Sequence, residues 1–177
     1  GGPGNDTYVF GTASAAEADT VTEGANDGID TLSFASLTTA VTLNLNSSLV
    51  QTVHTNRTLK LNASGTFENI VGGSGNDVLT GNSLDNSFTG NAGNDTMTGG
   101  SGNDTYVFGP AAVAEADIVA EATNQGTDIL SFASLTTAVT FNLSQNTVQA
   151  VHTNRTLKLN AGSTFENIIG GAGNDVL

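Results

Sequence analysis

The chain repeats itself at two nested periods, which restrict its possible folds more than any other feature. GGPGNDTYVFG at Gly1 recurs as GGSGNDTYVFG at Gly99, and VHTNRTLKLNA at Val53 recurs at Val151. Both offsets are 98 residues, and roughly three quarters of the overlapping positions are identical. We therefore expect a first repeat unit at residues 1–98 and an incomplete second unit at residues 99–177, stacked as one continuous solenoid.

A shorter period of nine residues lies inside each unit. Its eighth position is always large and apolar, and its first six positions are rich in Gly, Asn and Asp. One inward side chain in nine residues predicts a very short strand, and Gly and Asn are turn residues because they tolerate positive φ. The copies begin at Gly1, Gly72, Gly81, Gly90, Gly99 and Gly170.

The stretch between the nonapeptide copies, residues 10–71, contains further short extended segments. Together with the copies they predict ten strands per unit, close to one strand per nonapeptide length. The expected fold is an all-β parallel β-roll, or two-sided β-solenoid, with two strands per coil and five coils per unit. The predicted strands are 8–10, 20–22, 31–34, 41–45, 50–53, 58–61, 69–71 and those of the copies at Gly72, Gly81 and Gly90.

Two strands per coil would place every second turn on the same edge and bring acidic residues into rows. One edge would stack Asp77, Asp95 and Asp117. The other would stack Asp85 or Asn86, then Asp104 and Asp128, and in the first unit Asp6 would lie next to Asp30. Carboxylates about 5 Å apart repel one another by about 1 kcal/mol or more per pair unless a cation lies between them. Calcium suits such a gap because it takes six to eight oxygen ligands.

The copies match the pattern GGxGxDxUx, where U is a large apolar residue. They resemble the haemolysin-type calcium-binding nonapeptides of repeats-in-toxin proteins, and tandem copies make this resemblance specific. The resemblance implies calcium between stacked turns, bound by main-chain carbonyls and by the Asp of each turn. Carried over, it predicts a site in which Gly73, Gly75 and Asp77 face Gly90, Ala92 and Asp95.

The opposite edge departs from the pattern. There Asn82, Leu84 and Asn86 would face Gly99, Ser101 and Asp104, and Asn86 stands where the motif has Asp, so this site is expected to be weak or empty. The copies at Gly1 and Gly170 add Gly2, Gly4, Asp6 and Asp175 as predicted ligands. Asp19, Asp30, Asp117 and Asp128 lie outside the copies but precede predicted strands, so they are either ligands or ordinary turn residues.

The composition excludes several classes of function. Seventeen acidic residues against four basic ones give a net charge of −13, which repels nucleic acid and anionic lipid and attracts cations. Cysteine is absent, so disulfides and thiolate metal sites are excluded. No apolar run is long enough to insert into a membrane, and we find no nucleophile, zinc-protease or phosphate-loop motif. We therefore expect a chain that is not an enzyme.

The remaining charged residues have plain interpretations. The basic residues fall in a strand that we expect to have one solvated face, with a contact patch for the acidic turns of a neighbouring rod as the alternative. The glutamates could add calcium ligands, but we expect them to be solvated turn residues, and we expect the two histidines to lie at the surface. These residues are Arg57, Lys60, Arg155 and Lys158; Glu17, Glu23, Glu68, Glu115, Glu121 and Glu166; and His54 and His152.

The sequence favours an extracellular structural protein with several bound Ca²⁺ ions. Calcium binding would become folding free energy and stiffen a rod, as in a bacterial surface adhesin stalk or a secreted fibre, with end-to-end or lateral self-association through neighbouring units. The alternative is a calcium-dependent secretion and folding module of a secreted enzyme or toxin. A flat threonine face that binds ice or sugars is a third interpretation, but outward Thr is also simply a good strand former.

Overall fold

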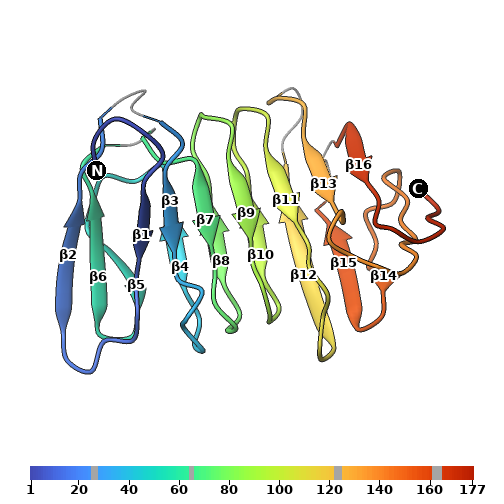
Figure 1. Ribbon diagram of the computed structural model, residues 1–177, viewed down its shortest axis with the longest axis horizontal. Helices are drawn as coiled ribbons and strands as arrows, with labels where there is room; N and C mark the ends of the chain where they lie inside the picture. The colour runs from blue at the N-terminus through green and yellow to red at the C-terminus, as the bar shows by residue number, and fades with distance from the viewer. Residues whose placement is uncertain (25–27, 64–65, 122–124, 161–164) are drawn as a thin grey trace.

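The computed structural model describes residues 1–24, 28–63, 66–121, 125–160 and 165–177. In these residues every regular element is a strand, and no helix is long and apolar enough to cross a membrane. The strands lie side by side along the long axis, with the two chain ends at opposite ends of the molecule (Figure 1). The predicted all-β parallel solenoid is confirmed.

Seven strands form one continuous parallel sheet, which we call sheet A. Its order is β1-β3-β7-β9-β11-β13-β16, so it contains strands from both 98-residue units. Neighbouring inward residues are in register, as with Phe88 and Tyr106. The strands are β1 (Thr7–Val9), β3 (Thr31–Ser33), β7 (Asn69–Val71), β9 (Ser87–Thr89), β11 (Thr105–Val107), β13 (Ile129–Ser131) and β16 (Asn167–Ile169).

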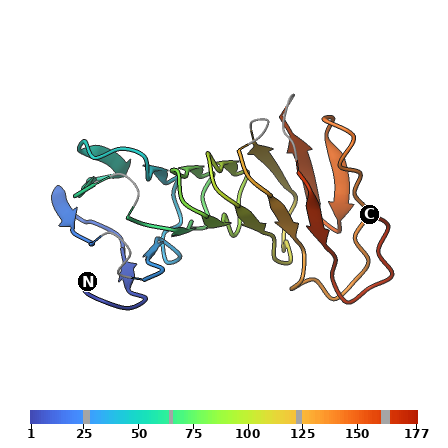
Figure 2. The same ribbon diagram turned by 90° about the horizontal axis from the view of Figure 1, so that it is seen from above.

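The opposite layer, seen across from sheet A in Figure 2, contains two sheets. The larger, sheet B, has the order β14-β15-β12-β10-β8-β4, and the smaller has the order β2-β6-β5. Sheet B contains β4 (Thr42–Asn44), β8 (Val78–Thr80), β10 (Thr96–Thr98), β12 (Glu115–Ala120), β14 (Gln149–His152) and β15 (Arg155–Leu159). The smaller sheet contains β2 (Glu17–Val21), β5 (Gln51–His54) and β6 (Arg57–Leu61).

The ten strands expected in the first unit all form, but their division into five equal coils is wrong. After β3 the chain places β4, β5 and β6 in the same layer before it returns to sheet A as β7. β5 and β6 are antiparallel, and only Thr55 and Asn56 connect them, a connection too short for a parallel crossover. Asn56, at φ 61°, supplies the left-handed residue that this hairpin needs. The second unit repeats the hairpin with β14, β15 and Asn154.

The core is a narrow stack of single side chains between the two layers. The four tandem copies from Gly72 bury their eighth motif position, so Leu79, Phe88, Met97 and Tyr106 are at most 1 % exposed. The Phe88 and Tyr106 rings stack with centroids 5.1 Å apart. Each such residue contributes about 1.5–3 kcal/mol through burial, and this core fixes the register of the turns at both edges.

Candidate metal centre

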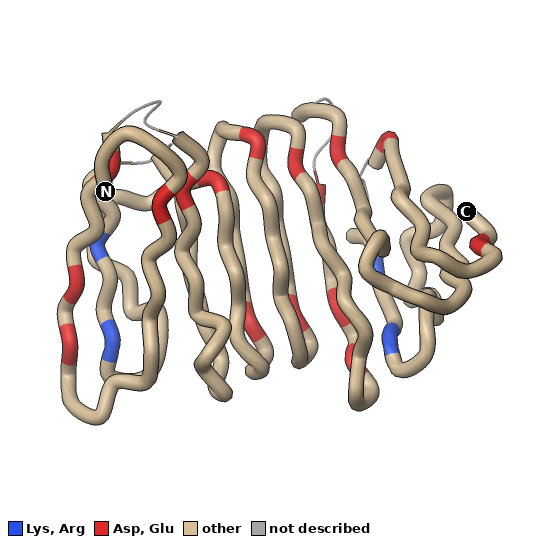
Figure 3. The backbone as a smooth tube through the Cα atoms, in the orientation of Figure 1, with Lys and Arg blue, Asp and Glu red and all other residues tan. Residues whose placement is uncertain are grey.

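The residues that precede the strands form two rows, one along each turn edge. We call Asp6, Asp30, Glu68, Asn86, Asp104, Asp128 and Glu166 the A ladder because they precede the strands of sheet A in spatial order. We call Asp77, Asp95 and Asp117 the B ladder because they lie at β8, β10 and β12 of sheet B. Acidic residues are concentrated near both ends of the strands (Figure 3).

The B ladder is held by hydrogen bonds from the backbone of one turn to the carboxylate of the next. The Asp77 N–H donates to Asp95 Oδ1 at 2.9 Å, and the Asp95 N–H donates to Asp117 Oδ1 at 3.0 Å. Val41 starts the row by donating its N–H to Asp77 Oδ1 at 2.8 Å. The predicted stacking of the three aspartates is therefore present in the structure.

The A ladder uses the same kind of bond in two runs, from Asp6 to Glu68 and from Asn86 to Glu166. The Asp6 N–H donates to Asp30 Oδ1 at 2.9 Å, which matches the expected neighbourhood of these two residues. The Asp30 N–H then donates to Glu68 Oε2 at 2.7 Å. Further along, Asn86 donates to Asp104, Asp104 to Asp128 and Asp128 to Glu166, with N–O distances of 2.7, 2.9 and 2.8 Å.

Burial makes the charged form of these carboxylates costly. Asp77, Asp95, Asp104 and Asp128 are each at most 2 % exposed. Loss of solvent, together with repulsion from neighbouring Asp77 and Asp117, raises the pKa of Asp95 to about 7. Loss of solvent also raises the pKa of Asp104 to about 7, with added repulsion from Asp128. A nearby cation would offset both effects.

The turn that begins at Gly72 and the turn that begins at Gly90 meet in the way a cation site requires. The Gly90 carbonyl oxygen and the Asp77 carboxylate converge on the space beside Gly72, where a Cβ would lie 2.8 Å from that carbonyl. Gly93, at φ 116°, lies against the Gly75 carbonyl, an approach that only glycine permits. The predicted ligands Gly75, Asp77 and Gly90 are thus brought together, and their hard oxygen donors fit calcium.

Two members of the same predicted site lie less directly in this gap. Gly73 donates its N–H to Asp77 Oδ2 at 2.7 Å, but its Cα faces the Leu37 carbonyl rather than the Gly90 turn. Ala92 is half-buried in the neighbouring turn.

On the other edge, the turns that begin at Gly81 and Gly99 meet in the same way, but the amide of Asn86 takes the place that the Asp77 carboxylate has on the first edge. The Gly99 carbonyl and Asn86 Oδ1 converge beside Gly81, and the Ser101 N–H donates to the Asn82 carbonyl at 3.1 Å. The Asn86 Nδ2 donates to the Glu68 carbonyl at 3.1 Å. This amide is therefore satisfied by protein acceptors, so a cation is not needed to hold the two turns together.

The terminal copies show parts of the same arrangement. The Gly2 N–H donates to Asp6 Oδ2 at 3.0 Å, and the Gly4 carbonyl lies against Gly28. In the copy at Gly170, Asp175 Oδ1 accepts from the Val139 N–H at 2.8 Å, as Asp77 does from Val41 in the first unit. The bond from the valine N–H to the motif aspartate is thus the same in both units.

Comparison with known families agrees with this geometry. A family model described as RTX calcium-binding nonapeptide repeat (4 copies) matches residues 64–83, 71–106 and 160–177. The chain carries RTX calcium-binding nonapeptide repeats. No curated protein matches it in a sequence search. The matched RTX segments include the turns of Asp77, Asp95, Asp104 and Asp175, which supports calcium as the cation for these turns.

Outside the RTX turns, two aspartates predicted as calcium ligands have an arginine as counterion. Arg155, 3 % exposed, pairs with Glu115 at 2.6 Å and with Asp117, because the register of β12 and β15 sets Glu115 opposite Arg155. In the first unit Arg57 pairs in the same way with Glu17 and Asp19. The guanidinium takes the position we assigned to calcium beside these aspartates.

Two further expectations for charged residues change because Arg57, Arg155 and His54 are buried. Neither arginine forms a contact patch for a neighbouring rod, since each is at most 8 % exposed and stacks over an aromatic ring, Arg57 on Phe10 and Arg155 on Phe108. His54 is 8 % exposed and contacts the Thr39 hydroxyl, so it is not a surface residue.

Sequence reasoning also missed glutamates that belong to the acidic edges. Glu23 and Glu121 are 3 % and 6 % exposed rather than solvated, and Glu68 and Glu166 accept ladder hydrogen bonds. A signal in the sequence could have identified Glu23 and Glu121. Each of these glutamates lies within two residues after the second strand of its unit, and the two are related by the 98-residue offset.

Proposed function

We propose that this chain is an extracellular structural repeat, which folds with calcium into a stiff rod that sets length in a bacterial surface adhesin stalk or an extracellular fibre. The observation that carries the proposal is that strands of both 98-residue units belong to the same sheets. Strand β11 of the second unit pairs with β9 of the first, and β12 pairs with β10. Tandem units would therefore extend one axis without a hinge between them.

The residues of the chain account for the dependence on calcium. The ladders stack buried carboxylates, and the carbonyls of Gly75 and Gly90 lie against the facing turns. Bound calcium supplies the divalent charge that offsets repulsion among these carboxylates. Without it, a net charge of −13 and a core one side chain wide favour an expanded chain. Millimolar extracellular calcium would then favour folding outside the cell, and no catalytic role is proposed.

The experiment is small-angle X-ray scattering of chains with two, four and eight tandem units, in calcium and in chelator. In calcium the maximum dimension should increase in proportion to unit number, and the cross-section should stay constant. In chelator all three should expand as flexible chains. A maximum dimension in calcium that grows much more slowly than unit number would overturn the proposal and favour a compact secretion module.

A further inference from the structure

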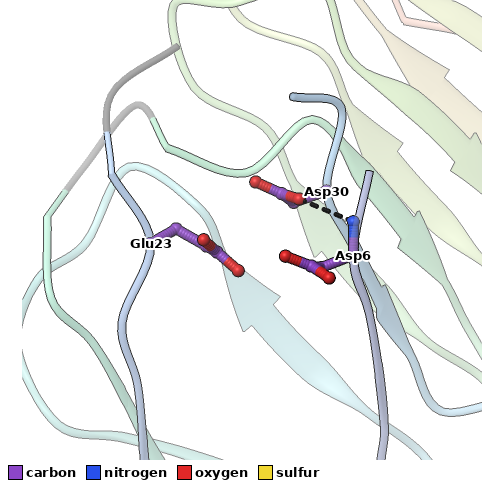
Figure 4. A group of neighbouring side chains, drawn as sticks. All are labelled: Asp6, Glu23 and Asp30. Carbon is purple, nitrogen blue, oxygen red and sulfur yellow. Dashed lines mark hydrogen bonds between the residues drawn. The ribbon is translucent and has the colours of Figure 1, made fainter. Parts of the chain in front are cut away.

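Three carboxylates meet where a nonapeptide turn adjoins the intervening stretch, once in each unit. In the second unit they belong to Asp104 before β11, Glu121 after β12 and Asp128 before β13, with one oxygen of each within 4.8 Å of the others. In the first unit the equivalent residues are Asp6, Glu23 and Asp30, and their side chains point toward a common centre (Figure 4). All three members are buried in the second unit.

A buried carboxylate oxygen in each cluster has no hydrogen-bond partner among the described residues. In the second unit this atom is Oδ2 of Asp104, a residue that is 0 % exposed. In the first unit it is Oε2 of Glu23, which is 3 % exposed. Leaving a buried charged oxygen without a partner is costly, so these atoms indicate a ligand that the protein itself does not supply.

The position of Glu121 indicates which kind of ligand these unpartnered oxygens would bind. Between two RTX turns, a carbonyl of the next turn converges with the motif acid beside the first motif glycine, as the Gly90 carbonyl does with Asp77. After Asp104 the next turn along sheet A is not an RTX turn, and the three atoms nearest the Cβ position of Gly99 include no carbonyl oxygen. Glu121 Oε1 instead converges there with Asp104 Oδ2 beside Gly99, and Glu23 Oε1 does so with Asp6 beside Gly1. A glutamate oxygen thus replaces a main-chain ligand.

A tyrosine fixes the orientation of this glutamate. The Tyr106 hydroxyl donates to Glu121 Oε1, and the Tyr8 hydroxyl donates to Glu23 Oε1. The Gly100 N–H also bonds to the Glu121 carboxylate. Tyr106 is therefore a positioning residue of the cluster.

We propose that each unit holds one further calcium site, formed by Asp104, Glu121 and Asp128 in the second unit and by Asp6, Glu23 and Asp30 in the first. It differs from the sites between RTX turns because a glutamate outside the nonapeptide motif completes it. Three carboxylates carry one more negative charge than a divalent ion neutralises, which suits a hard cation with oxygen ligands. This inference rests on the calcium-dependent folding proposed above.

The two tyrosines allow a selective test with terbium, a luminescent trivalent ion that takes the same oxygen ligands. The chain has two tyrosines and no tryptophan, and each tyrosine bonds to one cluster. Terbium emission excited through tyrosine should therefore report these sites. We expect Glu121→Gln to remove about half of that emission and the Glu23→Gln/Glu121→Gln pair to reduce it at least tenfold. Calcium counted by equilibrium dialysis should fall by two per chain in the pair.

The matched control is Asp85→Asn, which removes an exposed carboxylate on the same edge outside the cluster. Its sensitised emission should stay within twofold of the parent chain. Unchanged emission and ion count in the double variant would overturn the site. If the double variant does not fold in calcium, the test is made on the parent chain. Absence of tyrosine-sensitised emission from folded, terbium-loaded parent protein would then contradict the proposal. Failure of the parent chain to fold with calcium would instead contradict the function proposed above.

Discussion

A ladder aspartate bonds to two turns at once, which explains why a charged residue lies in so thin a core. Asp77 accepts from the Gly73 N–H of its own turn and from the Val41 N–H of the neighbouring strand. Its backbone N–H then donates to Asp95. These bonds favour the charged carboxylate, whereas burial disfavours it, and burial is the larger effect because the pKa of Asp77 is raised.

Asp95→Asn tests this balance at a single residue. The amide keeps the shape and removes a buried charge, so the calcium-free chain should be as stable as the parent or more stable at pH 7. The calcium midpoint of folding should rise roughly tenfold because one anionic ligand is lost. Calcium titration followed by circular dichroism measures both effects. A midpoint unchanged from that of Asp85→Asn would show that Asp95 is not a ligand.

The raised pKa values also predict how the calcium-free chain responds to pH. Burial raises the pKa of Asp95 and Asp104 to about 7, so the folded state binds protons more tightly than the unfolded state. Their contribution to folding is therefore present below pH 4 and is lost as pH rises through about 7. In chelator, β structure should appear at about pH 4–5 and disappear near neutrality. Stability in chelator that rises from pH 5 to pH 8 would contradict this account.

At the scale of the elements, the paired strands β12 and β15 combine acidic and basic residues in one buried group. Arg155 contacts Glu115 and Asp117, and all three are at most 4 % exposed. The B ladder therefore ends at a fixed positive charge within the chain. This end does not depend on calcium, and the same group recurs with partial exposure around Arg57 in the first unit.

Arg155→Met should be strongly destabilising because it leaves two buried carboxylates without their cation. We expect a loss of about 3–5 kcal/mol in the free energy of unfolding, measured by urea denaturation in saturating calcium. Lys158→Met, in the same strand, is the control and should change stability by less than about 0.5 kcal/mol. Equal effects of the two variants would show that the ion pairs add nothing to the fold.

The same elements show how far sequence reasoning reaches. Local patterns located all ten strands of the first unit and the rows from Asp77 to Asp117, because strand length and turn chemistry are encoded within nine residues. The hairpin of β5 and β6 was missed because the expectation of two strands per coil overlooked its two-residue connection, Thr55 and Asn56. Likewise, Arg57 meets Glu17 across 40 residues of chain, and Glu121 meets Asp104 across a coil.

At the scale of the whole molecule, rows of acidic residues along both turn edges flank a narrow apolar core. The sheets continue from one unit into the next, so the same stacking bonds serve within units and between them. Stability should accordingly depend on interfaces between neighbouring coils, and we expect the interface between the Gly72 and Gly90 turns to depend on a cation. Folding of the array is then controlled by calcium as a whole.

The most direct test of this account is far-ultraviolet circular dichroism of the chain during a calcium titration at pH 7, with magnesium as the control. We predict a cooperative rise in β signal between micromolar and millimolar calcium, and no such rise with magnesium, which demands smaller octahedral sites. The Asp77→Ala/Asp95→Ala variant should lose the transition. A chain that already shows its full β signal in chelator at pH 7, and does not respond to calcium, would contradict the central claim.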